Sequence, residues 1–372
     1  MNASCWPPSR FATDDRGRRP ERDQNPRWRR REWLRSVARA SLSASIAGLL
    51  SGCVGRSGDP QVVAYVALDR EFSAKWLERF QHDELVDVIA KWDVESTKTV
   101  GLVNAILLER DRPLCDLFWN NEILHTLRLQ RAGVLLPYES PTGKAYPVSF
   151  RDPAGAWHGF AARARVLVVH NERVPPGEEP RSVESLADPR WKGNAGIAKP
   201  LFGTTASHAA VLFARWGRVR SESFFRAVHE NARTMSGNKQ VATSVGRGQL
   251  AWGLTDTDDA IAEIEAGSPV RIVYPDQASD QEGTLLIPNT LAIIRNCRNP
   301  ERAKRLVDYL LRPEVERDLA LGESAQVPLH PAVKERPRVI GDPAPRWMDV
   351  DFAAAADAWD DASRWLKQLY LS

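Results

Sequence analysis

The chain has 372 residues, a formal net charge of +3 and 43% hydrophobic residues. Eleven arginines and five acidic residues precede residue 54, so the rest of the chain carries a net charge of about −3. That balance gives no electrostatic indication of nucleic-acid binding, and the length suffices for one large domain or two lobes with filled cores.

Residues 1–53 are predicted to be an export signal. An arginine-rich segment is followed by a short apolar run, Ala40–Leu50, and by small residues before Cys53. The run is too short to span a membrane, and Arg39 lies at its edge. Leu50-Ser51-Gly52-Cys53 resembles a lipobox, whose cysteine receives a diacylglycerol and becomes the new N-terminus. A soluble helix beside a structural cysteine is the alternative.

The segment around Arg30 and Arg31 resembles a twin-arginine export motif, with Trp33 and Arg35 near the usual Phe and Lys places. Arg29 departs from the usual Ser or Thr. Residues 54–60 would then form a polar tether. We expect a lipid-anchored protein in the periplasm or on the outer face of the cytoplasmic membrane.

Strand and helix patterns alternate from residue 61 onward. Short apolar runs predict strands, and apolar residues on one face predict helices. The alternation implies a parallel sheet covered by helices. Strands are expected at 61–67, 86–92, 115–119, 160–170, 195–198, 250–254, 270–274 and 291–294, and the longer helices at 97–107, 206–216, 237–245, 260–266, 301–311, 313–321 and 352–371.

Three predicted strands end in polar residues. In open α/β sheets, ligands bind beyond the carboxyl ends of the strands, so these ends would line one site. Polar residues there are also ordinary turn formers, which is the alternative for each of them. The three segments are Asp69-Arg70, Asn120-Asn121-Glu122 and Thr255 to Asp259.

Two helix starts offer hydrogen-bond donors. Thr204 and Thr205 precede a helix with no acidic residue in its first turn, and Asn238 opens another. Such N-termini hold anions through backbone N–H groups and the helix dipole, although a plain Thr N-cap is an equal alternative. Asp256 and Asp258 suit a hard cation, but at least one acidic residue of this run is expected to cap the helix that follows.

Cysteine usage and motifs indicate no catalysis. Cys115 and Cys297 lie in or beside apolar stretches, and their spacing does not decide whether they form a disulfide. The sequence contains no Walker-type loop, H-E-x-x-H motif or G-x-S-x-G turn. We therefore predict no enzyme, and no cofactor.

An ordered set of short matches resembles the solute-binding proteins of bacterial ABC importers, in the group named for ferric iron. The resemblance covers about residues 61–331. Its matches are Ala64-Tyr65, Asp69–Phe72, Thr97–Thr99, Asp116–Asn120, Ala162–Val169, Phe202–Thr205, Gly237–Lys239 and Asp308–Leu311.

The resemblance implies an α/β fold of the two-lobed periplasmic-binding-protein type II class, with a central cleft. The first lobe would take residues 61–168 and 277–325, and the second 169–276 and 326–372. Thr204, Thr205 and Asn238 match family positions that hold an anion beside a metal. However, Thr255 to Asp258 stand where the family's iron binders carry adjacent tyrosines.

The implied function is capture of a small solute, ferric iron or an organic molecule, for delivery to an ABC permease by a monomer. The expected ligand-binding residues are Asp69, Arg70, Asn121, Glu122, Thr204, Thr205, Asn238, Thr255, Asp256 and Asp258, with Asp256, Asp258 and Glu122 as ligands if a metal binds. The alternatives are an enzyme with Asp258 or Glu122 as general base, and a sensory or structural lipoprotein.

Overall fold

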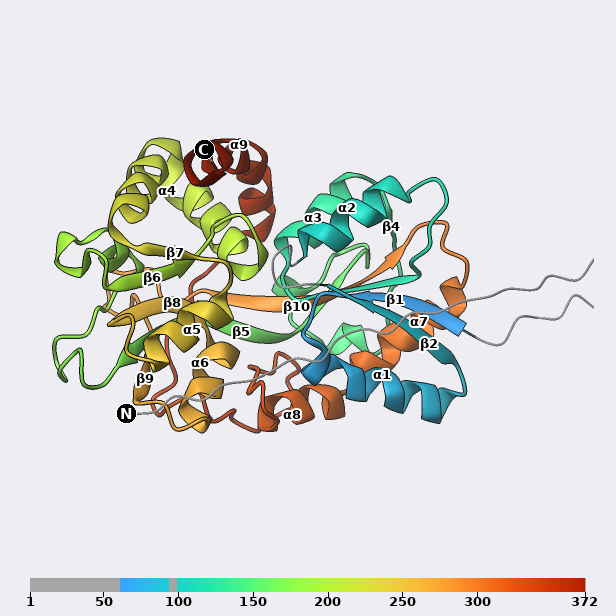
Figure 1. Cartoon of the computed structure of the whole chain (residues 1–372). Helices are drawn as coiled ribbons and strands as arrows, with labels where there is room; N and C mark the ends of the chain where they lie inside the picture. The colour runs from blue at the N-terminus through green and yellow to red at the C-terminus, as the bar shows by residue number, and fades with distance from the viewer. Residues whose placement is uncertain (1–60, 94–98, 372) are drawn as a thin grey trace, which may run out of the picture. The chain divides into compact units, whose positions relative to one another are not determined.

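A computed structural model describes residues 61–93 and 99–371, which lie within one compact unit of the chain, Ser57–Ser372 (Figure 1). The export signal, the tether 54–60 and Cys53 lie outside the described residues. Among the described helices, none is both long and apolar enough to cross a bilayer.

One mixed sheet runs through the unit in the order β2-β1-β3-β10-β5-β8-β6-β7, with β4 beside β10 and β9 beside β5. Parallel pairs lie at both ends of this order, and antiparallel pairs lie in its middle. The strands are β1 Gln61–Val66, β2 Asp87–Trp92, β3 Leu117–Asn120, β4 Leu135–Leu136, β5 His158–His170, β6 Ala195–Ala198, β7 Arg233–Met235, β8 Trp252–Asp256, β9 Val270–Val273 and β10 Leu286–Ile294.

Helices cover both faces of the sheet. In the part formed by β1, β2 and β3, α1 and α7 lie on one face and α2 and α3 on the other (Figure 1). The helices are α1 Arg70–Glu84, α2 Val100–Leu108, α3 Leu124–Arg131, α4 Gly203–Asn231, α5 Asn238–Gly246, α6 Thr257–Glu265, α7 Pro300–Leu310, α8 Pro313–Leu321 and α9 Phe352–Leu371.

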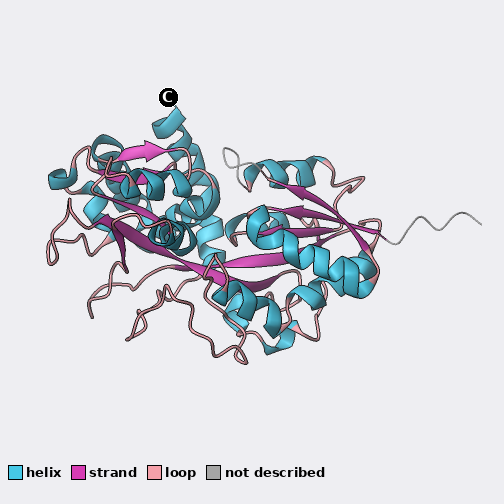
Figure 2. Ribbon diagram, turned by 60° about the horizontal axis from the view of Figure 1, so that its bottom comes forward, coloured by secondary structure: helices cyan, strands magenta, loops and turns pink. Residues whose placement is uncertain are grey.

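The middle strands β5 and β10 connect two groups of elements. The first half of β5 pairs with β10, and its second half pairs with β8 and β9. β10 in turn pairs with β3 and β4. We call the elements around β1–β4 the first lobe and those around β6–β9 the second lobe; Figure 2 shows the long strands running from one to the other.

The C-terminal helix α9 packs mainly on α4 of the second lobe and also touches α3 of the first. Arg131 of α3 donates to the carbonyl of Ala353 at 2.7 Å and pairs with Asp357 at 2.7 Å. At the other end of α9, the Tyr370 hydroxyl donates to the carbonyl of Phe225 at 3.3 Å. Helix α9 therefore links the two lobes.

Most predicted elements are present, with three differences. The sheet is mixed rather than parallel, because β5 and β10 must run back between the lobes. The predicted helix at 206–216 is part of a longer, kinked element, α4, in which Gly217 is non-helical (φ 75°). Strand β8 extends to Asp256, so Thr255 and Asp256 belong to the strand and not to its exit.

Cys115 and Cys297 are both buried free thiols in this structure, where no disulfide joins them. The Cys115 thiol donates to the carbonyl of Leu117 at 3.0 Å. Burial raises the pKa of both thiols, that of Cys297 to about 11, so both are protonated near neutral pH. They act as small core residues.

Candidate functional site

A buried ion pair lies at the centre of the predicted site. Arg165 projects from β5, and its Nη1 donates to Asp256 Oδ1 at 2.7 Å. The other oxygen of Asp256 accepts from the Thr204 hydroxyl at 2.5 Å and from Asn238 Nδ2 at 3.0 Å. The carboxylate of Asp256 is thereby held by three donors from three elements, none of them on its own strand.

The starts of α4 and α5 meet at this carboxylate. Thr204 also accepts from Asn238 Nδ2 at 2.8 Å, and Thr205 donates to Asn238 Oδ1 at 3.0 Å. Nη1 and Nη2 of Arg165 lie 3.3 and 3.2 Å from the hydroxyls of Thr204 and Thr205. The donors expected to hold an external anion are thus joined to the chain's own anion, Asp256.

Glu122, at the start of α3, is the centre of a second buried hydrogen-bond cluster. Its carboxylate accepts from Asn120 Nδ2 (2.9 Å), from the backbone N–H groups of Leu124 (2.6 Å) and His125 (3.0 Å), and from the Ser207 hydroxyl (2.5 Å). The ring Nδ1 of His125 lies 2.9 Å from the same carboxylate.

Burial alone would raise the pKa of Glu122. The charge and hydrogen bond of His125, with the bonds from Ser207 and Asn120, outweigh burial and lower this pKa. Glu122 is therefore ionised and fully hydrogen-bonded. It also supplies the cap of α3, a role that the sequence did not indicate.

A second arginine of β5, Arg163, lies between the Asp256 cluster and the Glu122 cluster. Its Nε forms an ion pair with Asp258 Oδ2 at 3.3 Å, and Nε has no hydrogen-bond acceptor among the described residues. Its Nη atoms donate over 3.3–3.4 Å to Asn289 Oδ1 and to the carbonyl of Asn121. Arg163 is thus buried, with an ion pair to Asp258 and two hydrogen bonds of 3.3–3.4 Å.

Four carboxylates act on the guanidinium of Arg163. Burial alone would lower its pKa, but the carboxylates of Asp258, Asp256, Asp69 and Asp259 raise it. Ligand oxygens of Asp256, Asp258 and Asp259 lie within 4.8 Å of one another. Oxygen atoms this close together can share one cation, although each of these carboxylates already has a partner in the chain.

The two lobes touch at this site. The Ser207–Glu122 hydrogen bond joins α4 to the start of α3. At the surface, Lys239 Nζ lies 3.7 Å from Glu71 Oε1, which joins α5 to α1. These contacts bring polar residues of the two lobes together.

The structure places the other predicted residues as follows. Asp69 is half-buried at the start of α1, and Asn121 is buried and accepts from the Thr99 hydroxyl at 2.8 Å. The Thr255 hydroxyl donates to the carbonyl of Asn238 at 3.0 Å. The guanidinium of Arg70 is exposed and lies 4.8 Å from the centre of the Trp92 ring, so no described contact joins it to the others.

Four residues of the site were missed from the sequence: Arg163, Arg165, His125 and Ser207. The signal for the two arginines was present, because they stand two residues apart, and so on one face, in a strand that is otherwise apolar between its terminal histidines. A charge pair on a buried face requires partners. His125 and Ser207 carry no comparable sequence signal.

Asp256 occupies the N-cap position of α6, but its side chain makes no capping hydrogen bond, because Arg165, Thr204 and Asn238 already hold it. Asp258 instead accepts the backbone N–H of Asp259 at 3.2 Å in the first turn of the helix.

His208, one turn into α4, adds a buried neutral group beside the ion pair. Neither ring nitrogen has a hydrogen-bond partner among the described residues. Burial, with the nearby charge of Arg165, lowers the pKa of His208 to about 3, so the ring stays neutral. No positive charge is therefore added to the Arg165–Asp256 pair.

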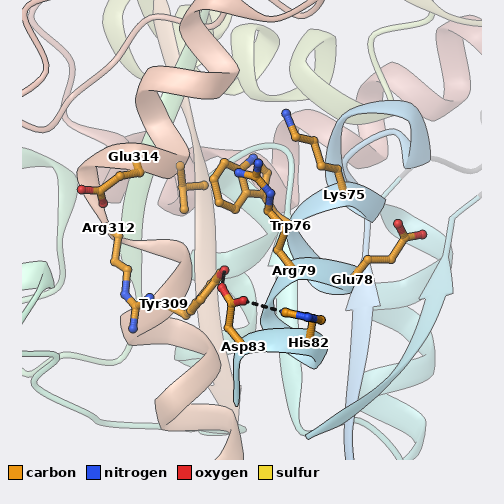
Figure 3. A pocket seen from close by; sticks show the side chains of 10 residues that line it. Lys75, Trp76, Glu78, Arg79, His82, Asp83, Tyr309, Arg312 and Glu314 are labelled. Atoms are coloured by element: carbon orange, nitrogen blue, oxygen red, sulfur yellow. Dashed lines mark hydrogen bonds and ion pairs between the residues drawn. The ribbon is translucent and has the colours of Figure 1, made fainter. Parts of the chain in front are cut away.

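A pocket of about 670 Å³ lies elsewhere, between α1 and α7 on the first lobe (Figure 3). Trp76 and Tyr309 line it, with Arg79 over the Trp76 ring and His82 hydrogen-bonded to Asp83. Its charged residues balance, with Lys75, Arg79 and Arg312 against Glu78, Asp83 and Glu314. No residue of the buried polar site lines it.

Comparisons with known proteins give a consistent result. The model of the family described as "Bacterial extracellular solute-binding protein" matches residues 122–355. Iron uptake protein A2 of Synechocystis is 25% identical over 279 residues, covering 70% of this chain and 80% of that protein.

Solved structures agree with the fold. Iron-bound HitA of Pseudomonas aeruginosa matches with a TM-score of 0.74 and 19% identity, covering 83% of this chain and 99% of that one. The periplasmic binding protein AfuA of Actinobacillus pleuropneumoniae, solved with fructose-6-phosphate, matches with a TM-score of 0.73 and 22% identity, covering 84% and 99%. The predicted two-lobed periplasmic-binding fold is thereby confirmed.

Proposed function

Because the chain belongs to the bacterial extracellular solute-binding proteins, we propose that it captures a small solute between its two lobes and delivers it to an ABC permease. The family consists of binding proteins, so the prediction that the chain is not an enzyme is confirmed. We further propose that the protein works as a lipid-anchored monomer outside the cytoplasmic membrane.

One observation carries this proposal: charged and polar side chains of both lobes meet at a single buried location. Glu122 of the first lobe binds Ser207 of the second, and Arg163 lies between Asn121 and Asp258. A solute that contacts both sides favours the closed arrangement, since only a difference in affinity between two conformations shifts their equilibrium.

We propose two roles for the predicted residues. Asp69, Asn121 and Asp258 surround Arg163, and we assign them to the solute. The remaining predicted residues shape the site through their mutual hydrogen bonds, apart from Arg70, which we place at its rim. These shaping residues are Glu122, Thr204, Thr205, Asn238, Thr255 and Asp256.

Ferric iron is the first candidate solute, because the relatives are named for iron uptake. In that case the metal is cargo rather than cofactor, and Asp256, Asp258 and Glu122 are its predicted ligands. An organic solute is the second candidate, because AfuA shares the fold and was solved with fructose-6-phosphate bound.

Native mass spectrometry of protein purified without denaturation tests the proposal. We expect a bound mass that is lost when the protein is unfolded and refolded, together with a change in small-angle scattering when a cell extract is added back. Absence of both effects contradicts solute capture. A solute that returns chemically altered instead supports an enzyme.

Membrane anchoring has a separate test. Replacing Cys53 by Ala removes the proposed lipid attachment site, so the exported protein should move from the membrane fraction to the soluble fraction. Cys5→Ala, in the same leader, is the matched control and should leave fractionation unchanged. Retention of the Cys53→Ala protein in the membrane contradicts the lipobox hypothesis.

A further inference from the structure

The first turns of α4 and α5 have no negative group of their own. Neither turn contains an acidic residue, and the N-cap residues Phe202 and Gly237 make no side-chain capping bond. Unpaired N–H groups give a helix start a partial positive charge, which favours an anion nearby. Thr204 and Asn238, in these turns, both donate to the carboxylate of Asp256, which comes from β8. The chain therefore supplies the anion itself.

The carboxylate of Asp256 is held by short bonds and is almost completely buried. It is 4% exposed, and Arg165 Nη1, the Thr204 hydroxyl and Asn238 Nδ2 donate to it at 2.7, 2.5 and 3.0 Å. Because Asp256 is attached to the chain, it loses none of the translational and rotational freedom that a bound solute loses. An external acid at this place would have to displace Asp256 and leave a second negative charge buried without its partners.

The donors are also bonded to one another. Asn238 Nδ2 donates to Thr204 Oγ1 at 2.8 Å, and the Thr205 hydroxyl donates to Asn238 Oδ1 at 3.0 Å. The buried guanidinium of Arg165 has an unused donor, because its Nε has no acceptor among the described residues. None of these features involves the carboxylate, so the donors should keep their places when it is removed. Guanidinium, hydroxyl and amide groups bind carboxylates and phosphates, so a small anion can take the vacated place.

We propose that Asp256 is a resident anion that determines solute specificity. It fills, from within the chain, the place that Arg165 and the starts of α4 and α5 would otherwise offer to an acidic group of the solute. The protein therefore selects against solutes that bring a phosphate or carboxylate group to this place. This inference rests on the proposed function, because it concerns the solute of the same site.

Chemical rescue with formate tests the inference on the exported full chain. Asp256→Ala removes the carboxylate, and formate is a free carboxylate small enough to replace it. We expect sodium formate to raise the melting temperature of this variant by at least about 2 °C over sodium chloride at equal ionic strength. The wild type, in which the place is filled, should show only the general effect of the salt. An equal response of the two proteins overturns the inference.

Two variants are the matched controls. Asp357→Ala removes the acidic partner of an exposed ion pair and reports the general effect of formate. Arg165→Met/Asp256→Ala has the vacated place without the guanidinium, so formate should stabilise it no more than Asp357→Ala. Equal stabilisation of the single and double variants overturns the inference, because formate then acts elsewhere.

The rescue remains decisive if Asp256→Ala is not recovered folded in chloride. The yield of folded protein after purification in formate is then the measurement. Recovery in formate supports the inference, and equal failure in both salts overturns it.

Inorganic phosphate tests the exclusion in the wild type. Isothermal titration should detect no saturable binding, since the place is occupied. Thr204→Val removes one of its donors, and a hydrogen bond to a charged group is strong enough to change affinity at least about tenfold. Phosphate binding that this variant weakens by that factor overturns the inference. Binding that the variant leaves unchanged lies elsewhere and agrees with it.

These measurements need no solute, so they separate failure of this inference from failure of the proposed function. If formate does not stabilise Asp256→Ala while native mass spectrometry shows a retained solute, the resident anion is wrong and solute capture stands. If formate stabilises the variant but no solute is retained, Asp256 is the resident anion and the proposed function is wrong.

Discussion

Replacing Asp256 by Ala should destabilise the fold far more than a comparable surface substitution. Asp256 and Arg165 form a 2.7 Å ion pair with side chains 5% and 0% exposed. Removing one partner of such a pair costs about 3–5 kcal/mol, because the other charge stays buried without compensation. Thr204 and Asn238 also lose their acceptor, which adds about 1 kcal/mol each. We expect a total loss of about 5–7 kcal/mol.

The assay is urea unfolding followed by tryptophan fluorescence, with the free energy of unfolding extrapolated to water. Asp357→Ala is the matched control: its ion pair with Arg131 is also 2.7 Å long, but the side chains are 75% and 38% exposed. Exposed pairs contribute about 0–1 kcal/mol, so this variant should be nearly as stable as the wild type.

A double variant isolates the role of the buried charge. In Arg165→Met/Asp256→Ala no charge is left unpaired, so we expect at least about 2 kcal/mol of the loss to be recovered. The reasoning is refuted if Asp256→Ala loses less than about 1 kcal/mol or if the two substitutions are simply additive. A small loss of stability with a large loss of solute affinity would make Asp256 a solute contact instead.

Three further substitutions test other parts of the structure. Folding lowers the pKa of Glu122, so the stability that this residue contributes is present above its unfolded pKa near 4.5 and is lost as the pH falls through its folded pKa. Glu122→Gln should therefore flatten the acid side of a plot of melting temperature against pH. Ser207→Ala removes a hydrogen bond to a charged acceptor between the lobes, worth about 1.5–3 kcal/mol, so small-angle scattering should detect a larger molecule, whereas Ser221→Ala, whose bond to Leu212 stays within α4, should not change its size. Gly217 has φ 75° in open space, so Gly217→Ala should lower the free energy of unfolding by about 1 kcal/mol, and an unchanged urea midpoint would contradict that view of the kink.

The sequence predicted those elements whose signals are local. The helix at 352–371 matches α9 residue for residue, and Pro300 and Pro313 begin α7 and α8 as the missing proline N–H favours. Strand β10 was predicted only at 291–294 but begins at Leu286, because Pro288 and the irregularity beside it break the strand pattern. Pairing across the lobes, which makes the sheet mixed, has no local signature.

The site was predicted less completely than the fold. Their position at polar strand ends predicted Glu122 and Asp256 as site residues, and both are buried and hydrogen-bonded in the site. Their roles depend on partners distant in sequence, such as Ser207 for Glu122 and Arg165 for Asp256, and spacing alone does not reveal such partners. The predicted contribution of each of these residues to solute binding stays a prediction.

The attachment of α9 to both lobes has a consequence for how widely the molecule can open. Strands β5 and β10 connect the lobes through the covalent chain. The bonds from Arg131 of α3 to Ala353 and Asp357 of α9 add a non-covalent connection, which can break. The long side chain of Arg131 can keep these bonds when the distance between the lobes changes only slightly. A wider opening of the lobes breaks these bonds and separates α9 from α3, so residues outside the buried polar site contribute to its free-energy cost.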